Sequence, residues 1–151
     1  MNLLAFDTST ETLSVAVQRG SSVWEHTGPG GAQASHGLLA SIQTLLAQAG
    51  LELGALDALA FGRGPGSFTG LRTACAVAQG LAFGAGGGRG LRVLPIDTLH
   101  AVAEQARSVL EDMPVQAIKV GFAGSAANLG MIAHVAADYP ELPLVAYMPP
   151  L

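Results

Sequence analysis

The sequence predicts an α/β fold built on a five-stranded mixed β-sheet, and three observations support this. Short apolar or alternating segments occupy residues 3–6, 13–17 and 22–26, and only short turns separate them. Further along, strand-like segments alternate with segments of helical period. The composition also fits a packed domain, because 50% of the 151 residues are hydrophobic and only 12% are charged.

The first three strands form a predicted antiparallel meander. Residues 3–6 are apolar and end at the polar sequence Asp7-Thr8-Ser9, which is typical of a buried strand that closes in a loop. Residues 13–17 alternate between apolar and small or polar side chains, which is the period of a half-exposed strand. Gly20-Ser21 marks a turn into a third strand over residues 22–26, and strands joined by such short turns pair antiparallel.

The following elements alternate between helix and strand. Ser35 suits the start of a first helix, Gly50 its end, and Thr98 the start of a third helix. The elements are expected over residues 36–49 (helix), 56–61 (strand), 68–84 (helix), 91–96 (strand) and 98–109 (helix), with a glycine-rich loop over residues 86–90. Three strands followed by helix, strand, helix, strand and helix is the order of a ribonuclease-H-like half-domain, in which parallel strands extend the meander.

The last third of the chain predicts a βαβ unit. Its elements are a strand over residues 117–122, a helix over 126–137 and a strand over 144–147. We expect a domain boundary between residues 106 and 107, with both parts packed as one compact unit.

Charge and cysteine content exclude several classes of function. The net charge is −4 and the seven basic residues are scattered, so no basic stripe follows a phosphate backbone and no direct nucleic-acid binding is expected. The single cysteine, Cys75, excludes a disulfide framework, and its apolar neighbours favour a buried thiol. The first seven residues lack a signal-peptide pattern and no apolar run is long enough to span a bilayer, so we expect a cytoplasmic protein without membrane contact.

The polar sequence at the end of the first strand is a candidate phosphate-loop remnant. In Asp7-Thr8-Ser9 a carboxylate is followed by hydroxyls and backbone N–H groups, a combination that can hold a magnesium-bound phosphate. The alternative is that Asp7 and Thr8 only satisfy the backbone groups of a turn. The sequence leaves both interpretations open.

A second motif lies between the fourth strand and the second helix. The glycines in the run from Gly62 to Arg72 allow a sharp turn, and Ser67 or Thr69 can cap the helix start, where an anion could also bind. The run is not a P-loop and lacks the context of a dinucleotide fingerprint. We therefore predict a structural glycine motif formed by Gly64, Pro65, Gly66, Ser67, Thr69, Gly70 and Arg72.

Four segments of the chain resemble the TsaB family in their order and spacing. They are Leu4-Ala5-Phe6-Asp7-Thr8-Ser9, the lone His36 at the start of the first helix, Gly64-Pro65-Gly66-Ser67-Phe68-Thr69-Gly70-Leu71-Arg72, and Pro95-Ile96-Asp97-Thr98-Leu99. The third segment is highly specific, and the resemblance covers about residues 1–106. It implies an actin-like fold and a scaffold role, without catalysis or a cofactor, in tRNA threonylcarbamoyladenosine synthesis.

The same resemblance implies a protein interface. Members of the TsaB family dimerise, or bind the related catalytic subunit TsaD, through the first two helices of this half-domain. The helix over residues 68–84 carries many small residues, which would let another helix approach closely. On these two helices we expect the partner to contact His36, Leu39, Ala74, Ala78 and Leu81.

No metal site and no catalytic residue are predicted. The catalytic relatives of the TsaB family carry two histidines four residues apart on the corresponding helix, but here Ala40 follows His36 at that spacing. A single imidazole is not a metal site, and the other histidines make no ligand spacing with His36. Peptidase chemistry also lacks support, because no Ser–His–Asp spacing stands out.

The C-terminal part resembles a different family. Residues 105–151, through the segments 108–121 and 139–145, are similar to an internal piece of hydroxymethylpyrimidine/phosphomethylpyrimidine kinase, which implies a ribokinase-like origin. Phe122 stands where that family has methionine, and Tyr147-Met148-Pro149 where it has Asp-Pro, so the acidic residue expected near the phosphates is missing.

Two resemblances that meet near residues 105–107 indicate a chimera. The leading hypothesis is a non-catalytic partner of a TsaD-type subunit, or a homodimer. The alternative is an inactive remnant of a thiamine-biosynthetic kinase, since phosphoryl transfer needs metal, clamp and base together.

Overall fold

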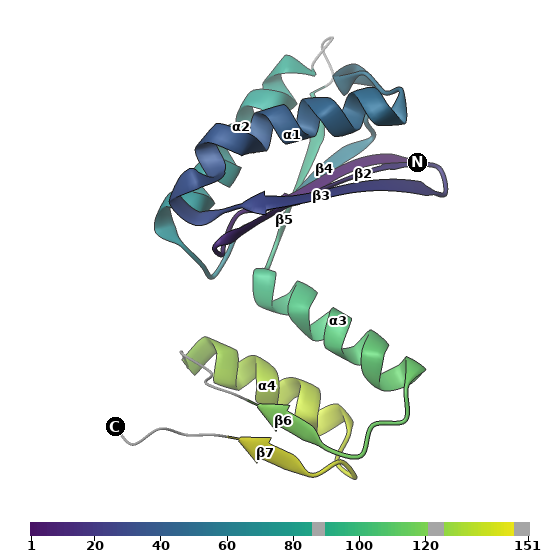
Figure 1. Cartoon of the computed structure of the whole chain (residues 1–151), viewed down its shortest axis with the longest axis vertical. Coiled ribbons are helices and arrows are strands. Elements are labelled where there is room, and N and C mark those ends of the chain that lie inside the picture. The colour runs from purple at the N-terminus through teal and green to yellow at the C-terminus, as the bar shows by residue number, and fades with distance from the viewer. Residues whose placement is uncertain (86–89, 121–125, 147–151) are drawn as a thin grey trace. The chain divides into compact units, whose positions relative to one another are not determined.

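The structure, a computed structural model, describes residues 1–85, 90–120 and 126–146 (Figure 1). These residues belong to two compact units, Met1–Thr98 and Leu99–Leu151. The boundary predicted between residues 106 and 107 lies within a continuous helix, α3 (Thr98–Asp112). Several predicted features lie outside the described residues: most of the 86–90 loop, the end of the 117–122 strand with Phe122, and Tyr147-Met148-Pro149.

The first unit contains the predicted five-stranded mixed sheet. Its strands are β1 (Asn2–Asp7), β2 (Thr12–Arg19), β3 (Ser22–Pro29), β4 (Ala58–Gly62) and β5 (Arg92–Ile96), in the order β3-β2-β1-β4-β5. β1 pairs antiparallel with β2, and β2 with β3, whereas β1–β4 and β4–β5 are parallel. In this register Phe6 lies opposite Val15 on one side and Phe61 on the other. The meander extended by parallel strands is thus confirmed.

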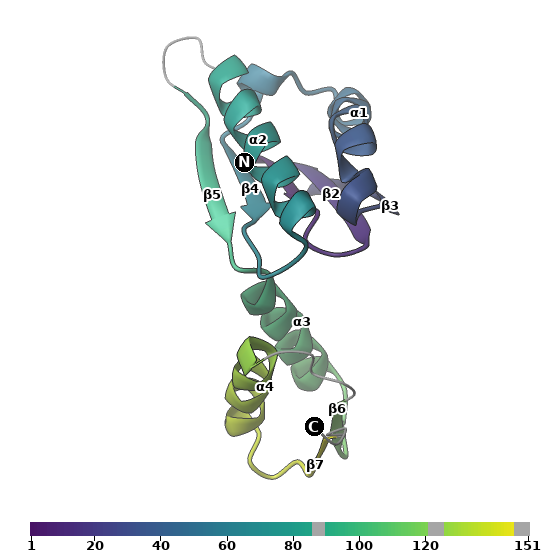
Figure 2. The ribbon, with the colours of Figure 1, turned by 90° about the vertical axis from the view of Figure 1, so that its left-hand side faces the viewer.

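Two helices cover one face of this sheet. Figures 1 and 2 show α1 (Ala34–Ala49) and α2 (Phe68–Gly84) side by side on that face. Two short 3-10 helices, Gly31–Gln33 and Leu53–Ala55, precede α1 and β4 respectively. Gly50 ends α1 in the left-handed conformation, with φ of 62°, as expected for a glycine at this position.

The helix starts differ in how well they were predicted. The Ser67 hydroxyl accepts a hydrogen bond from the Gly70 N–H at 3.4 Å, so Ser67 caps α2 as predicted. The predicted cap of α1, Ser35, is wrong. The 3-10 turn over Gly31–Gln33 leads directly into the helix, so Gln33 is the N-cap residue and Ser35 lies inside α1.

The core of the first unit lies between the sheet and the two helices. Alternate positions of β1 and β2 point into it, which is why the apolar residues of these strands recur every second position. α1 contributes a stripe of large aliphatic side chains, whereas α2 contributes mainly alanines, so α2 lies close to the sheet. The buried members are Leu4, Phe6, Leu13, Val15, Val17, Leu38, Ile42, Leu45, Leu46, Ala49, Leu56, Leu59, Ala74 and Ala78.

The sheet ends in two unlike edge strands, β3 and β5. In β5 the Ile96 carbonyl accepts a hydrogen bond from the N–H of Arg63, which follows β4, at 2.8 Å. Because backbone groups alternate in direction along a strand, Pro95 therefore occupies a position whose backbone faces away from β4. Proline has no N–H to offer, so β5 lacks a donor on its outer side.

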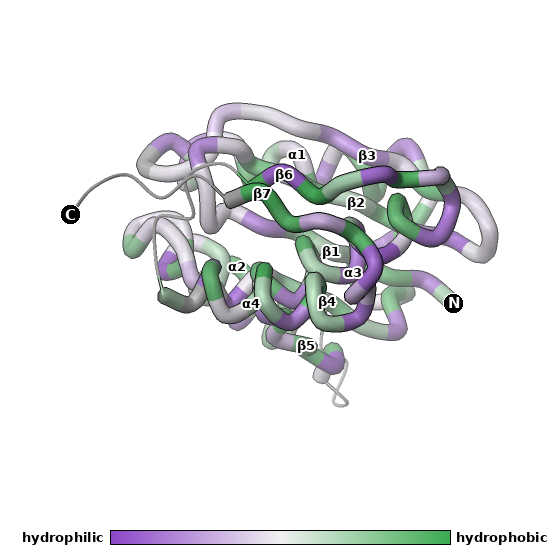
Figure 3. The backbone as a smooth tube through the Cα atoms, turned by 90° about the horizontal axis from the view of Figure 1, so that it is seen from below, coloured by the Kyte–Doolittle hydropathy of each residue, from purple (hydrophilic) through white to green (hydrophobic). Residues whose placement is uncertain are grey.

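The second unit has the predicted βαβ order. After α3 come β6 (Ile118–Val120), α4 (Ala126–Asp138) and β7 (Leu144–Ala146), and β6 pairs parallel with β7, with Ile118 opposite Leu144. Figure 3 shows β7 as hydrophobic along its length. Ala103 of α3 and Val135 of α4 are the buried hydrophobic residues described in this unit.

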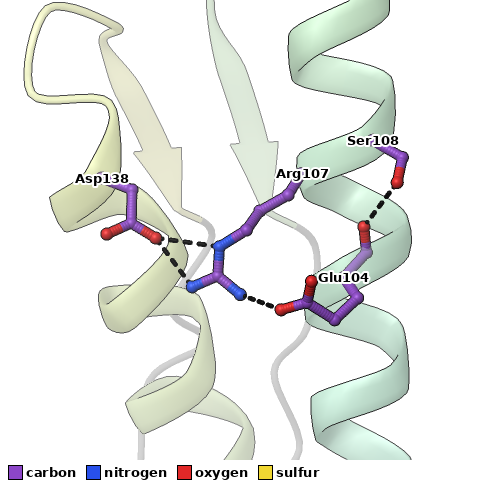
Figure 4. Close-up of polar contacts among 4 residues, drawn as sticks. All are labelled: Glu104, Arg107, Ser108 and Asp138. Atoms are coloured by element: carbon purple, nitrogen blue, oxygen red, sulfur yellow. Dashed lines mark hydrogen bonds and ion pairs between the residues drawn. The ribbon is translucent and has the colours of Figure 1, made fainter.

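An arginine joins the two helices of the second unit (Figure 4). The Arg107 guanidinium donates from Nε and Nη2 to Asp138 Oδ2, at 2.9 and 2.7 Å, and from Nη1 to Glu104 Oε1 at 2.6 Å. The hydrogen bond to Asp138 raises the pKa of Arg107 further above its ordinary value. The charge is therefore permanent at any working pH and holds α4 to α3.

Candidate functional site

The candidate site lies where β1, β4 and β5 end. The carboxyl ends of parallel strands meet at one edge of a sheet, and in α/β folds this is the edge where ligands bind. Here it brings together Asp7 after β1, Gly62-Arg63 after β4, and Asp97-Thr98 after β5. The sequence placed these residues far apart, and the fold makes them neighbours.

The Asp7 carboxylate is held by groups of the chain itself. Its Oδ1 accepts a hydrogen bond from the Ser9 N–H at 2.6 Å, and its Oδ2 accepts one from the Thr98 hydroxyl at 3.0 Å. A Cβ at Gly62 would overlap the Asp7 carboxylate, so a larger residue there would force this carboxylate to move. Asp7 thus connects the end of β1 to β4 and to the start of α3.

Thr8 is anchored on the glycine motif. Its side chain is fully buried, and its hydroxyl donates to the Gly70 carbonyl at 2.8 Å. A Cβ at Gly70 would overlap the Thr8 carbonyl oxygen. Glycine at position 70 therefore lets the first turn of α2 lie directly against the loop after β1.

Ser9 is the third contact between the loop and the motif. Its carbonyl accepts a hydrogen bond from the Ser67 N–H at 2.6 Å, and a Cβ at Gly66 would overlap Ser9. The Ser9 side chain is only 2% exposed, and its hydroxyl has no hydrogen-bond partner among the described residues. Ser9 Oγ is thus the polar atom of this loop that intrachain contacts leave unused.

The glycine motif also supports the start of α3. Gly64 adopts φ of 99°, a conformation that favours glycine, and its carbonyl accepts a hydrogen bond from the Thr98 N–H at 3.0 Å. The bond between Gly64 and Pro65 is cis. Thr69 is exposed, and Arg72 stacks on the Phe68 ring, with Cζ 4.5 Å from the ring centroid. Gly66, Ser67 and Gly70 therefore clamp the loop after β1 and Gly64 holds Thr98, while Pro65, Thr69 and Arg72 face outward.

The predicted interface residues separate into two groups. His36 and Leu39 on α1 are exposed and Leu81 on α2 is half-buried, so their side chains are accessible. Ala74 and Ala78 are 0% and 1% exposed and belong to the core of the first unit. Their placement at a partner interface is corrected: they let α2 approach the sheet of this chain, and a partner cannot reach them.

The outward face of α2 carries residues that the sequence interpretation missed. Phe68, Arg72, Ala76, Gln79 and Phe83 are all exposed and recur at helical spacing; we call them the α2 outer stripe. Phe68 is 71% exposed and Phe83 is 91% exposed. Their spacing of four, four, three and four residues, opposite the alanines, was the signal that could have identified this face.

Formal charge is nearly absent from the two helices. Of the 33 residues in α1 and α2, Arg72 alone is charged. Neither helix has an acidic residue in its first turn or a basic residue in its last turn, although such charges usually stabilise helix ends. Water-facing helices normally carry charges on their outer side. The outer surface of α1 and α2 is therefore unlike a surface built only for solvent.

A shallow depression of about 460 Å³ adjoins α1. It lies between the end of β3 and the start of α1, and two imidazoles, those of His26 and His36, line it. The remaining lining residues are Leu13, Gly28, Pro29, Gln33, Gly37 and Ser41. No group of three or more His, Cys, Asp or Glu side chains suited to a metal ion occurs in residues 1–85, 90–120 and 126–146.

Two further predictions concern Cys75 and the membrane. Cys75 is a free thiol of intermediate exposure, less buried than predicted, and Gln79 Nε2 lies 3.6 Å from its sulfur. Among the described helices, none combines the length and the apolar character needed to cross a membrane.

Comparison with known proteins identifies the family. The family model described as "TsaD: tRNA N6-adenosine threonylcarbamoyltransferase" matches residues 27–129, more than half of the chain. The chain belongs to the TsaD family. The match covers α1, α2, the glycine motif and α3, and it begins after the loop that follows β1.

Curated relatives support the resemblance to the TsaB members of this superfamily. The chain is 50% identical over 109 residues to the tRNA threonylcarbamoyladenosine biosynthesis protein TsaB of Haemophilus influenzae, covering 70% of this chain and 43% of that protein. It is 40% identical over 106 residues to the TsaB protein of Escherichia coli, covering 70% of this chain and 44% of that protein. The chain therefore spans less than half the length of these relatives.

Solved structures support the fold. YeaZ from Pseudomonas aeruginosa superposes with a TM-score of 0.65 at 41% identity, covering 73% of this chain and 50% of that one. A second structure, of a protein similar to peptidase YeaZ from Pseudomonas aeruginosa, gives a TM-score of 0.67 at 37% identity, covering 82% and 55%. The first unit thus has the actin-like, ribonuclease-H-like architecture predicted for it.

The family match extends beyond the predicted change of origin. It runs to residue 129, whereas the sequence interpretation assigned residues from 107 onward to a kinase fragment. The relatives described above give no support to a ribokinase-like tail. A chimeric origin stays a prediction.

Proposed function

We propose that the chain is a non-catalytic partner subunit in tRNA threonylcarbamoyladenosine modification. It binds a TsaD-type catalytic subunit, or a second copy of itself, through the outer surface of α1 and α2. One observation carries this proposal: these two helices contain a single charge in 33 residues and expose two phenylalanines.

The composition of this surface supports a protein partner. The centres of protein interfaces are depleted of charge and enriched in aromatic residues and arginine. Phe68, Phe83 and Leu39 expose large apolar side chains on the two adjacent helices, and Arg72 supplies the arginine. A monomer in water gains nothing from such a surface, since exposed aromatic rings lower solubility.

The contacts at the polar edge of the sheet fit a structural role. Both oxygens of Asp7 and the hydroxyl of Thr8 are engaged by other groups of the chain. Here the Thr8 hydroxyl holds the loop after β1 against α2, the helix that carries the outer stripe, while Asp7 holds Ser9 and Thr98.

The names of the relatives support the biological process that we propose. Both curated relatives are named as tRNA threonylcarbamoyladenosine biosynthesis proteins. The residues matched by the family model include α1 and α2. The name of the family model describes a transferase, which is the kind of catalytic subunit that a scaffold would accompany.

A binding experiment with the full chain tests the proposal. Mixing it with a purified TsaD-type subunit should give a complex by size-exclusion chromatography with light scattering. Phe83→Ser should weaken binding at least tenfold, because a central aromatic at an interface contributes about 2 kcal/mol or more. The fold should survive, since the Phe83 side chain is 91% exposed.

The matched control is Val23→Ser on the edge strand β3, another exposed hydrophobic residue on a different surface. It should change binding less than twofold. If the chain at tens of micromolar forms neither a complex with the TsaD-type subunit nor a dimer, the proposal is wrong.

A further inference from the structure

We propose that His26 and His36 together bind a divalent transition metal ion, of which zinc is the representative, in the depression between β3 and α1. The two imidazoles are the protein ligands, and water completes the coordination of the ion. This inference does not rest on the proposed function. It comes from the way the fold brings together two histidines that belong to different elements.

The pairing of β3 with β2 directs His26 toward the helices. His26 lies opposite Val15, and Gly28 lies opposite Leu13. Residues that lie directly opposite each other in paired strands point to the same face of a sheet. Val15 and Leu13 belong to the buried core beneath the helices, so the His26 side chain lies on the face that the helices cover. Because β3 is an edge strand, the imidazole is still exposed.

Two glycines make room for the depression. A Cβ at Gly28 would lie 3.3 Å from His26 Nε2 and 3.9 Å from Leu13 Cδ2, and a Cβ at Gly37 would lie 3.6 Å from the same Leu13 atom. The end of β3 and the first turn of α1 therefore approach each other over the Leu13 side chain. Both glycines line the depression of about 460 Å³, and so do the imidazoles of His26 and His36.

The imidazole nitrogens are available to a ligand. Within the parts of the chain that the structure describes, His26 makes no hydrogen bond or ion pair, and His36 makes one, between Nδ1 and Ser35 Oγ at 3.4 Å. The Nε2 atoms of both rings are therefore unused. Imidazole nitrogen is a preferred ligand of Zn²⁺, Cu²⁺ and Ni²⁺. A hydrogen bond at the other ring nitrogen orients a histidine ligand, and Ser35 supplies one to His36.

The surroundings favour a transition metal over a hard cation. No carboxylate is among the residues that line the depression, whereas Mg²⁺ and Ca²⁺ need several oxygen ligands. Two nitrogen ligands leave the other positions of the ion to water, so the site is more open than a structural site with four protein ligands. Helical spacing alone could not reveal this pair, because one histidine comes from a strand and the other from a helix.

The test is a titration of the untagged full chain with ZnCl₂ by isothermal titration calorimetry. One ion should bind per chain, and His26→Ala and His36→Ala should each weaken binding at least tenfold. Removing the second histidine as well should cost much less than removing the first, because the two ligands act as a pair. The matched control is His134→Ala, which removes an exposed histidine from α4 and should change binding less than twofold.

Stability measurements provide a second readout. A metal that binds the folded chain in preference to the unfolded chain stabilises it. Saturating ZnCl₂ should therefore raise the urea midpoint of the unmodified chain and of His134→Ala, but not the midpoints of His26→Ala and His36→Ala. Without metal, these two variants should unfold close to the midpoint of the unmodified chain, because both side chains are exposed. Excess MgCl₂ should neither raise the midpoint nor displace zinc.

Three results would overturn this inference. The first is the absence of saturable zinc binding by the unmodified chain. The second is zinc binding that His26→Ala and His36→Ala retain within twofold, as a site at the Cys75 thiol would give. The third is displacement of zinc by MgCl₂. Each of these results leaves the proposed function intact, because that function is tested separately through Phe83 on α2.

Discussion

Replacing Gly70 by alanine is expected to destabilise the first unit, although alanine is the better helix former. A Cβ at position 70 would overlap the Thr8 carbonyl oxygen, which is backbone and cannot rotate away. The first turn of α2 and the loop after β1 would have to separate. That movement breaks the buried hydrogen bond from the Thr8 hydroxyl to the Gly70 carbonyl, now 2.8 Å long.

The magnitude follows from three contributions. Losing a buried hydrogen bond costs about 1–3 kcal/mol, overpacking a further ~1–3 kcal/mol, and the helix propensity of alanine returns about 1 kcal/mol. The net loss is then about 1–5 kcal/mol, a large share of the stability of a small domain.

Gly80→Ala is the matched control in the same helix. Its Cβ would have no atom within 4 Å, so the expected change is a gain of up to about 1 kcal/mol. The free energy of unfolding of both variants is measured by urea denaturation, with Trp24 fluorescence as the signal. Trp24, the single tryptophan, packs partly against the core of the first unit and therefore reports on that unit. Equal midpoints for Gly70→Ala and the unmodified chain would refute the clamp that we describe between α2 and the loop.

Three further predictions concern other parts of the chain. Ala78→Arg should unfold or strongly destabilise the first unit, by at least about 3 kcal/mol in urea unfolding, because it places a charge in the core; a folded, fully stable variant would contradict this. Thr98→Val should cost about 1.5 kcal/mol in the same assay, since it removes the hydroxyl that donates to Asp7. In the second unit, partial burial raises the pKa of the Tyr139 phenol above its ordinary value of 10.0, and the charges of Glu111 and Asp138 raise it further. The folded chain therefore holds the Tyr139 proton to a higher pH than the unfolded chain does, so protonated Tyr139 contributes to stability below pH 10, and this contribution is lost as the pH rises through the folded pKa. Amide hydrogen exchange of α4 should show the loss of stability, and Tyr139→Phe should abolish this pH dependence.

Local patterns predicted the elements of this fold well. Alternation located β2, and helical spacing located α1 and α2 to within two residues at their starts. The prediction that Ser35 caps α1 failed because a serine before a segment of helical period is a good cap in isolation. No local pattern indicates the 3-10 turn over Gly31–Gln33. The prediction that Ala74 and Ala78 contact a partner failed for a different reason. Periodicity shows that they share a face, but only the position of the sheet decides that this face points inward.

The contacts of the candidate site could not be predicted in the same way. Asp7-Thr8-Ser9 and the glycine motif were both recognised, yet nothing in their patterns indicates that residues about sixty positions apart touch. Only the parallel pairing of β1 with β4 brings their ends together. The resulting contacts explain why glycines stand at positions 62, 66 and 70, which no turn signal alone requires.

The proline in β5 limits how this protein could assemble through its backbone. An exposed strand edge invites another strand to add to it, and repeated addition at both edges produces fibres. Pro95 removes one hydrogen-bond donor from the outer side of β5, which makes strand addition at this edge less favourable. Growth of fibres by strand addition is therefore disfavoured at the β5 edge of the first unit.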